Sequence, residues 1–127
     1  MTGESVLIVD DNPINLKLEK ILLKVEGYDV VTASDAEEAQ KVLETFQPRL
    51  ILMDLQLPGM SGLELTTKLK ANPKYSNIVI VAITAYAMKG DKEKALAAGC
   101  NGYISKPIDT KTLPGVISSY LNQKKAS

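Results

Sequence analysis

Short apolar runs alternate along the chain with longer stretches in which apolar residues recur at helical spacing. The runs are rich in β-branched and aliphatic residues, which is typical of strands buried on both faces of a sheet. They occupy residues 6–9, 30–33, 50–53, 78–83 and 103–105. Each run is followed by a stretch that predicts a helix. Five strands alternating with five helices predict an α/β fold in which helices cover both faces of a parallel sheet.

The first predicted helix has the clearest boundaries. Asn12 is a suitable N-cap, Pro13 occupies the first helical position, and Gly27 ends the helix. Apolar residues follow at the spacing of an amphipathic helix, whose apolar stripe normally faces the core. These residues are Ile14, Leu18, Ile21, Leu22 and Val25.

The other helices are bounded by the same kinds of signal. Capping-box patterns at 34–37 and 61–64 open the second and third helices. The fourth helix is rich in Ala, Lys and Glu and runs from about 89 to 98. The last helix begins at 109 or 110 and reaches about Leu121.

Polar side chains gather where the predicted strands end. Right-handed crossovers place the carboxyl ends of all the strands at one edge of the sheet, where ligands bind in folds of this kind. The first strand ends in Asp10 and Asp11, the third in Asp54, the fourth in Thr84 and the fifth in Ser105 followed by Lys106. Taken singly, these residues also suit a helix cap, a turn, a strand or solvated surface. Together they bring three carboxylates, two hydroxyls and an ammonium group to one edge.

Three adjacent carboxylates repel one another. Two like charges about 4 Å apart cost on the order of 4 kcal/mol at an effective dielectric constant near 20, so the group must take up protons or bind a cation. Lys106 neutralises only part of this charge. Mg²⁺ is the natural partner, because it prefers a few carboxylates and keeps waters that a phosphate can replace. Such a site suits phosphoryl transfer, with one carboxylate attacking phosphorus.

Composition narrows the possible functions. The chain has 127 residues, about the size of one domain, and fifteen acidic residues balance fifteen basic ones, so no basic field attracts nucleic acid or an anionic membrane. The absence of histidine excludes Ser-His and Cys-His catalysis and histidine metal sites. Cys100 is the single cysteine, which excludes an internal disulfide and fits a reducing compartment. No signal-peptide pattern follows Met1, and no apolar run is long enough to span a bilayer.

Four segments, in this order and at these spacings, resemble the receiver domains of two-component response regulators. They are residues 6–12, 50–62, 82–85 and 103–107. The resemblance covers about 6–121. It implies a flavodoxin-like, doubly wound sheet of five strands in the order 2-1-3-4-5 with five helices. It also implies that residues 1–127 form a single receiver domain, with a core of about 5–121 and a frayed tail at 122–127.

The resemblance assigns a role to each acidic residue. It makes Asp54 the phosphoacceptor, and it makes Asp11 a direct Mg²⁺ ligand together with Asp54 and the backbone carbonyl of Gln56. Asp10 acts on the metal through water.

The resemblance also assigns the other residues of this edge. Thr84 senses the phosphoryl group and Lys106 contacts it. Tyr103 is the aromatic residue that turns inward on activation, and Ala85 leaves room for the phosphoryl group.

A receiver domain implies a partner at each end of a phosphorelay. The donor is a histidine kinase or a histidine phosphotransferase, and the output is a protein contact through the fourth helix, fifth strand and fifth helix. We therefore expect a cytoplasmic phosphorylation switch that catalyses only its own phosphorylation and dephosphorylation. Residues 11–15 and 85–91 look most like single-domain regulators of the cell-cycle type or receivers of hybrid kinases. The start at Met1 favours a stand-alone regulator over a module cut from a longer protein.

Three other functions are compatible with parts of this pattern. An aspartyl phosphatase would place its nucleophile after the first strand with a second Asp two residues on, whereas Asp10 and Asp11 are adjacent and residue 12 is Asn. A flavin or nucleotide module would need a Gly-rich or Ser/Thr-rich phosphate loop there. A receiver-like scaffold that accepts no phosphate would not need the intact set of acids, hydroxyl and lysine.

Overall fold

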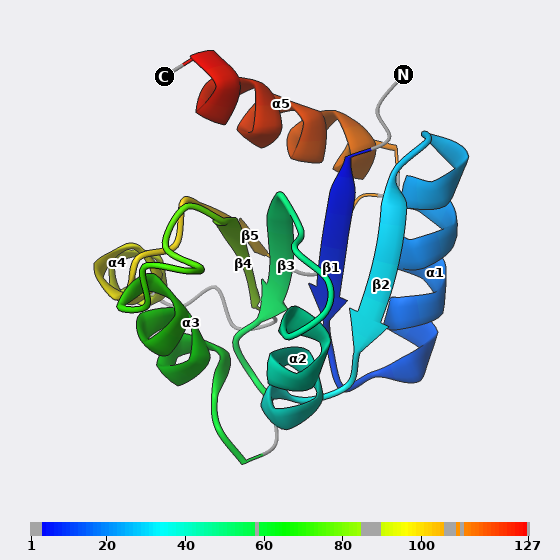
Figure 1. Ribbon diagram of the computed structural model, residues 1–127. Coiled ribbons are helices and arrows are strands. Elements are labelled where there is room, and N and C mark those ends of the chain that lie inside the picture. The colour runs from blue at the N-terminus through cyan, green and yellow to red at the C-terminus, as the bar shows by residue number, and fades with distance from the viewer. Residues whose placement is uncertain (1–3, 58, 85–89, 106–108, 110, 127) are drawn as a thin grey trace.

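The computed structural model describes residues 4–57, 59–84, 90–105, 109 and 111–126 (Figure 1). The strands are β1 (Ser5–Val9), β2 (Asp29–Ala33), β3 (Leu50–Asp54), β4 (Val79–Thr84) and β5 (Gly102–Ser105). The helices are α1 (Pro13–Val25), α2 (Ala36–Leu43), α3 (Gly62–Lys70), α4 (Asp91–Ala98) and α5 (Leu113–Ala126).

All five strands run parallel in the order β2-β1-β3-β4-β5, which confirms the predicted doubly wound fold. β3 lies at the centre of the sheet and pairs with β1 on one side and β4 on the other. The strand order reverses between β1 and β3, so the carboxyl ends of these two strands flank the topological switch point where ligands bind.

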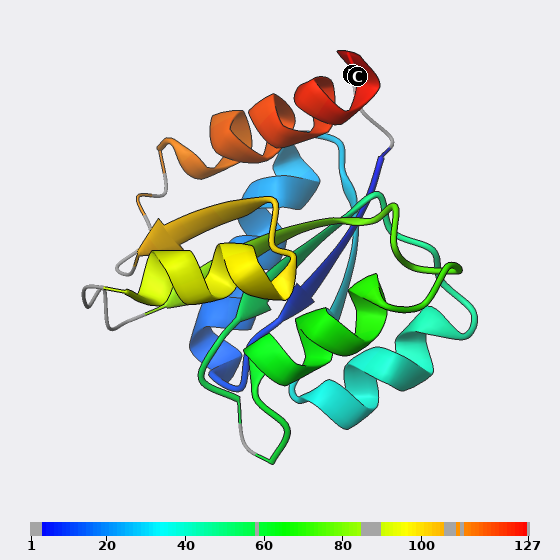
Figure 2. The same ribbon diagram turned by 90° about the vertical axis from the view of Figure 1, so that its left-hand side faces the viewer.

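Helices cover both faces of the sheet (Figure 2), and an apolar core lies on each face. Successive side chains of a strand point to opposite faces, so each central strand contributes to both cores. In β3, Leu50 and Leu52 pack with α1 and α5, whereas Ile51 and Met53 pack with α2, α3 and α4. This burial on both faces explains why the central strands are continuously apolar.

Side-chain caps fix the starts of three helices. Oδ1 of Asn12 accepts the N–H groups of Ile14 (2.9 Å) and Asn15 (3.3 Å), as predicted. Oγ of Ser61 accepts the N–H of Glu64 (3.2 Å), which confirms the cap of α3. The N-cap of α2 is Asp35 rather than Ser34, because the pattern is shifted by one residue: Asp35 accepts the N–H of Glu38 (2.8 Å).

Of the five apolar residues in the stripe predicted for α1, Leu22 is partly buried and packs against the core, whereas the other four are exposed. Ile14, Leu18, Ile21 and Val25 are 77%, 44%, 51% and 78% exposed. The opposite side of the helix packs on the sheet and carries Glu19 and Leu23, which are buried, and Leu16, which is partly buried. α1 therefore has apolar residues on both sides, and its most regular stripe faces solvent.

The last helix is shifted toward the C-terminus relative to the prediction. α5 begins at Leu113 rather than at 109 or 110, so Pro114 lies in its first turn, where a missing N–H is tolerated. The helix continues to Ala126, beyond the predicted end at about Leu121. None of the helices in the described part of the chain is both long and apolar enough to cross a membrane.

Lys70 links three segments at the end of the sheet where the strands begin, opposite their carboxyl ends. From the last residue of α3, its Nζ donates to the carbonyl oxygens of Ser76 (3.2 Å) and Ile78 (2.6 Å) and to Oδ1 of Asn101 (3.1 Å). Oδ1 of Asn101 also accepts the N–H of Ile80 in β4 (2.9 Å). One ammonium group thus joins α3, the segment before β4 and the turn before β5.

Candidate functional site

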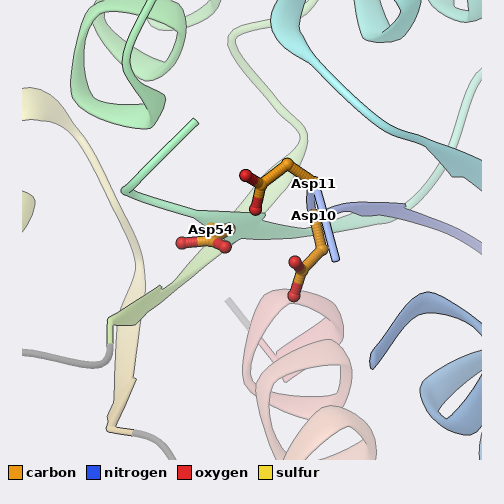
Figure 3. A group of neighbouring side chains, drawn as sticks. All are labelled: Asp10, Asp11 and Asp54. Atoms are coloured by element: carbon orange, nitrogen blue, oxygen red, sulfur yellow. The ribbon is translucent and has the colours of Figure 1, made fainter. Parts of the chain in front are cut away.

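Three carboxylates meet at the switch point of the sheet. Asp10 and Asp11 directly follow β1, and Asp54 is the last residue of the neighbouring strand β3. One carboxylate oxygen atom from each of the three residues lies within 4.8 Å of those from the other two. Figure 3 shows Asp10 and Asp11 projecting to opposite sides of the strand end, with Asp54 facing them from β3. The structure therefore brings together the acidic residues that the sequence predicted as one site.

Short loops hold two of these carboxylates in place. The N–H of Asn12 donates to Oδ1 of Asp10 (2.9 Å), and the N–H of Gln56 donates to Oδ1 of Asp54 (2.9 Å). Each bond joins a carboxylate to the backbone two residues later, which is the geometry of an Asx turn. Both carboxylates are thus directed by their own loops.

Burial makes this group of charges costly without a counter-charge. Asp10 and Asp54 are only 1% and 2% exposed, whereas Asp11 is exposed. Neighbouring like charges repel one another more strongly when water is excluded. The site therefore favours binding of a cation.

The donor set fits a hard divalent cation. All three side chains offer carboxylate oxygens, which Mg²⁺ and Ca²⁺ prefer over nitrogen or sulfur ligands. One exposed carboxylate beside two buried ones leaves the site open to solvent on the Asp11 side. An open site suits Mg²⁺, which retains water molecules that a substrate oxygen can replace. The residues present therefore fit the metal that the sequence predicted.

Thr84 is the hydroxyl that belongs to this edge. It is the last residue of β4 and is fully buried. β4 pairs directly with β3, and Asp54 pairs with Ile83, the residue before Thr84. The hydroxyl and the predicted nucleophile thus end neighbouring strands at nearly the same level.

Gln56 contacts both of these groups, which the sequence did not predict. Its backbone N–H donates to Asp54, while its side-chain Nε2 donates to Oγ1 of Thr84 (3.0 Å). The Thr84 hydroxyl in turn lies 3.4 Å from Oε1 of Gln56 as a donor. The sequence singled out Gln56 only for its backbone carbonyl.

Tyr103 lies one strand further out. It belongs to the edge strand β5, is partly buried, and packs against the core beneath α2, α3 and α4. Its strand partner is Ala82 of β4, two residues before Thr84. Side chains alternate along a strand, so Ala82 and Thr84 point to the same face of the sheet. Tyr103 therefore lies on the strand beside the one that carries the hydroxyl.

Gly62 was not predicted as part of the site, although it supports Asp54 directly. A Cβ atom at this position would lie 2.8 Å from Cα of Leu55 and closer still to the carbonyl oxygen of Asp54. The N–H of Gly62 also donates to the carbonyl of Leu55 (3.2 Å). A glycine directly after the helix cap Ser61 is the only sequence signal of this close approach.

Two predicted site residues, Lys106 and Ala85, lie outside the described residues. Their assignments remain predictions. The other predicted positions are all described, and those that follow or end β1, β3 and β4 meet at one edge of the sheet.

Comparison with known proteins gives a consistent result. The family model of the response regulator receiver domain matches residues 6–118. The chain is 44% identical over 118 residues to the polar-differentiation response regulator DivK of Brucella anthropi. The aligned residues cover 93% of this chain and 96% of that protein. DivK of Brucella ovis matches with the same identity and coverage.

Solved structures show the same likeness. A CheY-like receiver domain protein from Methanospirillum hungatei has a TM-score of 0.89 and 32% identity, over 97% of both chains. The receiver domain of the sensor histidine kinase PA1611 from Pseudomonas aeruginosa has a TM-score of 0.85 and 32% identity, over 95% of this chain and 99% of that one. That structure holds a magnesium ion coordinated in its active site cleft. These matches favour a receiver over the aspartyl-phosphatase and flavin-module alternatives.

Proposed function

The chain belongs to the response regulator receiver domain family of two-component signalling, and on this premise we propose that it is a phosphorylation switch whose phosphoacceptor is Asp54. The observation that carries the proposal is the position of Asp54. Its carboxylate is buried, directed by the N–H of Gln56, and within 4.8 Å of the oxygen atoms offered by Asp10 and Asp11.

The proposed reaction is transfer of a phosphoryl group from a phosphohistidine protein. An oxygen atom of Asp54 forms a bond to phosphorus, and the bond between phosphorus and the imidazole nitrogen breaks. The electron pair of the broken bond returns to the imidazole, and Asp54 becomes an acyl phosphate. The chain thus takes part in one transfer and one later hydrolysis of its own aspartyl phosphate, and it does not turn over other substrates.

The carboxylates have a second role in this proposal, which is to hold Mg²⁺. Asp11, Asp54 and the backbone carbonyl of Gln56 are the direct ligands, and Asp10 acts through a water molecule. A bound Mg²⁺ offsets the negative charge of the phosphoryl oxygens. The support is the set of three carboxylates, two of them buried. Magnesium in the Pseudomonas aeruginosa receiver structure adds to it.

The switch depends on residues beyond the carboxylates. We assign to Thr84 a hydrogen bond to the phosphoryl group and to Lys106 a charged contact with it. We assign to Ala85, which follows Thr84 in the sequence, the small side chain that leaves room for the phosphoryl group. When Thr84 moves toward the phosphoryl group, Tyr103 turns inward from β5, and the surface formed by α4, β5 and α5 changes for a downstream protein to recognise.

The exposed stripe of α1 offers a docking surface for the phosphodonor. It starts at Ile14, three residues after Asp11, and so begins beside the acidic site. The stripe consists of Ile14, Leu18, Ile21 and Val25, whose spacing of four, three and four residues is that of a helix–helix seam. An open groove along it is lined by Pro13, Lys17 and the first three of these residues. We assign this surface to a helix of the histidine kinase or phosphotransferase.

Such a partner places the switch in the cytoplasm, where histidine kinases present their phosphorylated domains. The free thiol of Cys100 is compatible with this reducing compartment. Likeness to the DivK proteins over 96% of their length supports a role as a response regulator.

Labelling of Asp54 tests the proposal. Incubation with acetyl phosphate and Mg²⁺ adds one phosphoryl group to the wild-type chain, as measured by intact mass. Asp54→Asn abolishes the addition. Asp35→Asn is the matched control, because Asp35 caps α2 outside the acidic cluster and asparagine is also a good cap. Undiminished labelling of Asp54→Asn, with Asp35→Asn like wild type, rejects the assignment.

A further inference from the structure

Gln56 links the predicted nucleophile to the predicted sensor hydroxyl. Its backbone N–H binds the Asp54 carboxylate at 2.9 Å, and its side-chain amide binds Oγ1 of Thr84 at 3.0 Å. The two contacts come from different parts of one residue. Thr84 is 28 residues away in sequence and fully buried, whereas Gln56 is exposed.

The amide can pair with the hydroxyl in two alternative ways, because Nε2 and Oε1 of the same amide reach Oγ1 from nearly the same direction. In one arrangement Nε2 donates to Oγ1 at 3.0 Å, and in the other the hydroxyl donates to Oε1 at 3.4 Å. A hydroxyl has a single proton to donate. In the second arrangement the proton is directed to Oε1 of Gln56 and not to an oxygen atom on Asp54.

We propose that Gln56 is a positioning residue that holds the Thr84 hydroxyl in its resting orientation and thereby sets how strongly the chain responds to phosphorylation. The inference rests on the proposed function, because it assigns the regulation of that same site. The proposed movement of Thr84 toward the phosphoryl group exchanges the Gln56–Thr84 hydrogen bond for one between Thr84 and the phosphoryl group. The net free energy of switching is the difference between the free energies of these two bonds. The bond to Gln56 therefore makes switching less favourable.

The size of the effect follows from the strength of one hydrogen bond. A neutral intramolecular hydrogen bond of this kind changes an equilibrium by about three- to tenfold. When only a fraction of the protein is in the binding-competent state, its apparent affinity for the ligand is reduced by that fraction. Removing the amide therefore tightens binding of a phosphoryl mimic by about three- to tenfold.

The test uses beryllofluoride, which bonds to the aspartate oxygen and stands in for the phosphoryl group. Its dissociation constant is measured with Mg²⁺ present, by amide NMR titration. Gln56→Leu keeps the backbone N–H and carbonyl and removes only the amide. Gln40→Leu is the matched control, because Gln40 also donates through Nε2, to the carbonyl of Ala36 in α2, away from the site.

A double-mutant cycle shows whether Gln56 acts through Thr84. We expect Gln56→Leu to tighten beryllofluoride binding about three- to tenfold, and Gln40→Leu to change it less than about twofold. In a Thr84→Val background, which lacks the hydroxyl, Gln56→Leu is expected to change binding less than about twofold.

Each contrary outcome has a separate meaning. Unchanged or weaker binding by Gln56→Leu overturns the positioning role, and so does an equal gain in the Thr84→Val background. In both cases normal binding by wild type leaves the proposed function standing. Absence of beryllofluoride binding by the wild-type chain overturns the proposed function and this inference together.

Discussion

Gly62 lies so close to Asp54 that no side chain fits between the first residue of α3 and the backbone of the predicted phosphoacceptor. A Cβ atom there would overlap the Asp54 carbonyl oxygen and lie 2.8 Å from Cα of Leu55. Neither group is the mobile end of a side chain, so neither can move aside without shifting the loop after β3. The start of α3 thus fixes the position of the Asp54 backbone.

We therefore expect Gly62→Ala to destabilise the fold by about 1–3 kcal/mol, the usual cost of overpacking, and to slow labelling of Asp54 by acetyl phosphate. Gly115→Ala in α5 is the control, because its added methyl group meets no atom within 4 Å. That change should stabilise the helix by about 0.5–1 kcal/mol. Urea denaturation measures both, and equal effects of the two substitutions would contradict the close approach at Gly62.

The acidic cluster predicts that one substitution changes stability in opposite ways with and without metal. In the presence of a chelator, Asp11→Asn should raise the free energy of unfolding by about 1 kcal/mol, because it removes a charge that repels Asp10 and Asp54. With millimolar Mg²⁺ the wild type should gain stability and the variant should gain less, since a ligand that binds the folded state stabilises it. Asp29→Asn, on the exposed start of β2, is the control. An equal response of wild type and Asp11→Asn to Mg²⁺ argues against a metal at this cluster.

The docking role of α1 predicts a defect that depends on the phosphodonor. A histidine kinase that labels the wild type should transfer its phosphoryl group to Leu18→Gln at least about tenfold more slowly, because a central apolar contact is lost. Labelling by acetyl phosphate, which needs no protein contact, should stay unchanged. Leu96→Gln on α4 is closely matched, since Leu96 is 46% exposed and Leu18 is 44% exposed. Slower transfer in both variants would show that α1 is not the specific docking surface.

Lys70 predicts a loss of stability far from the acidic site. Lys70→Met removes three hydrogen bonds from Nζ, of 2.6–3.2 Å, and leaves two backbone carbonyls without that donor. We expect a cost of about 2–4 kcal/mol. Lys68→Met, on the exposed side of the same helix, should cost less than about 0.5 kcal/mol. Thermal denaturation compares them, and a cost for Lys70→Met no larger than that for Lys68→Met would contradict the role of the ammonium group.

Burial of Cys100 predicts a pH dependence of stability in alkali. Desolvation raises the pKa of the Cys100 thiol above 9.0, while a hydrogen bond with Thr66 and the charge of Lys70 act in the opposite direction. The folded chain therefore keeps the thiol proton at a pH where the unfolded chain has lost it. Stability should fall as pH rises from about 9.0 toward the higher pKa of the folded state, and the fall should be smaller in Cys100→Ala. Identical pH profiles for the two proteins would exclude this contribution.

Much of the fold could be predicted because its signals are local. Asn12 with Pro13 and Ser61 with Glu64 define helix starts within a few residues, and the structure has both caps. The carboxylates could also be predicted, because a parallel sheet brings the residues after β1 and β3 to the same edge whatever the loops do.

Other features depend on tertiary packing. Periodicity along α1 shows a regular stripe at Ile14, Leu18 and Ile21 but not which side of the helix meets the sheet, and the buried Glu19 makes the true inner face look polar. The contact between Gln56, which follows β3, and Thr84, which ends β4, joins residues 28 positions apart in the sequence. It depends on a side-chain direction that no local pattern specifies.

Gln56 uses its main chain toward Asp54 and its side chain toward Thr84, so the two contacts can vary independently. Every residue type except proline supplies the same N–H, so a substitution here can leave the Asp54 loop in place while changing the group that faces the hydroxyl. The position therefore offers protein engineers a way to adjust the response threshold of a signalling circuit without altering the acid that carries the signal.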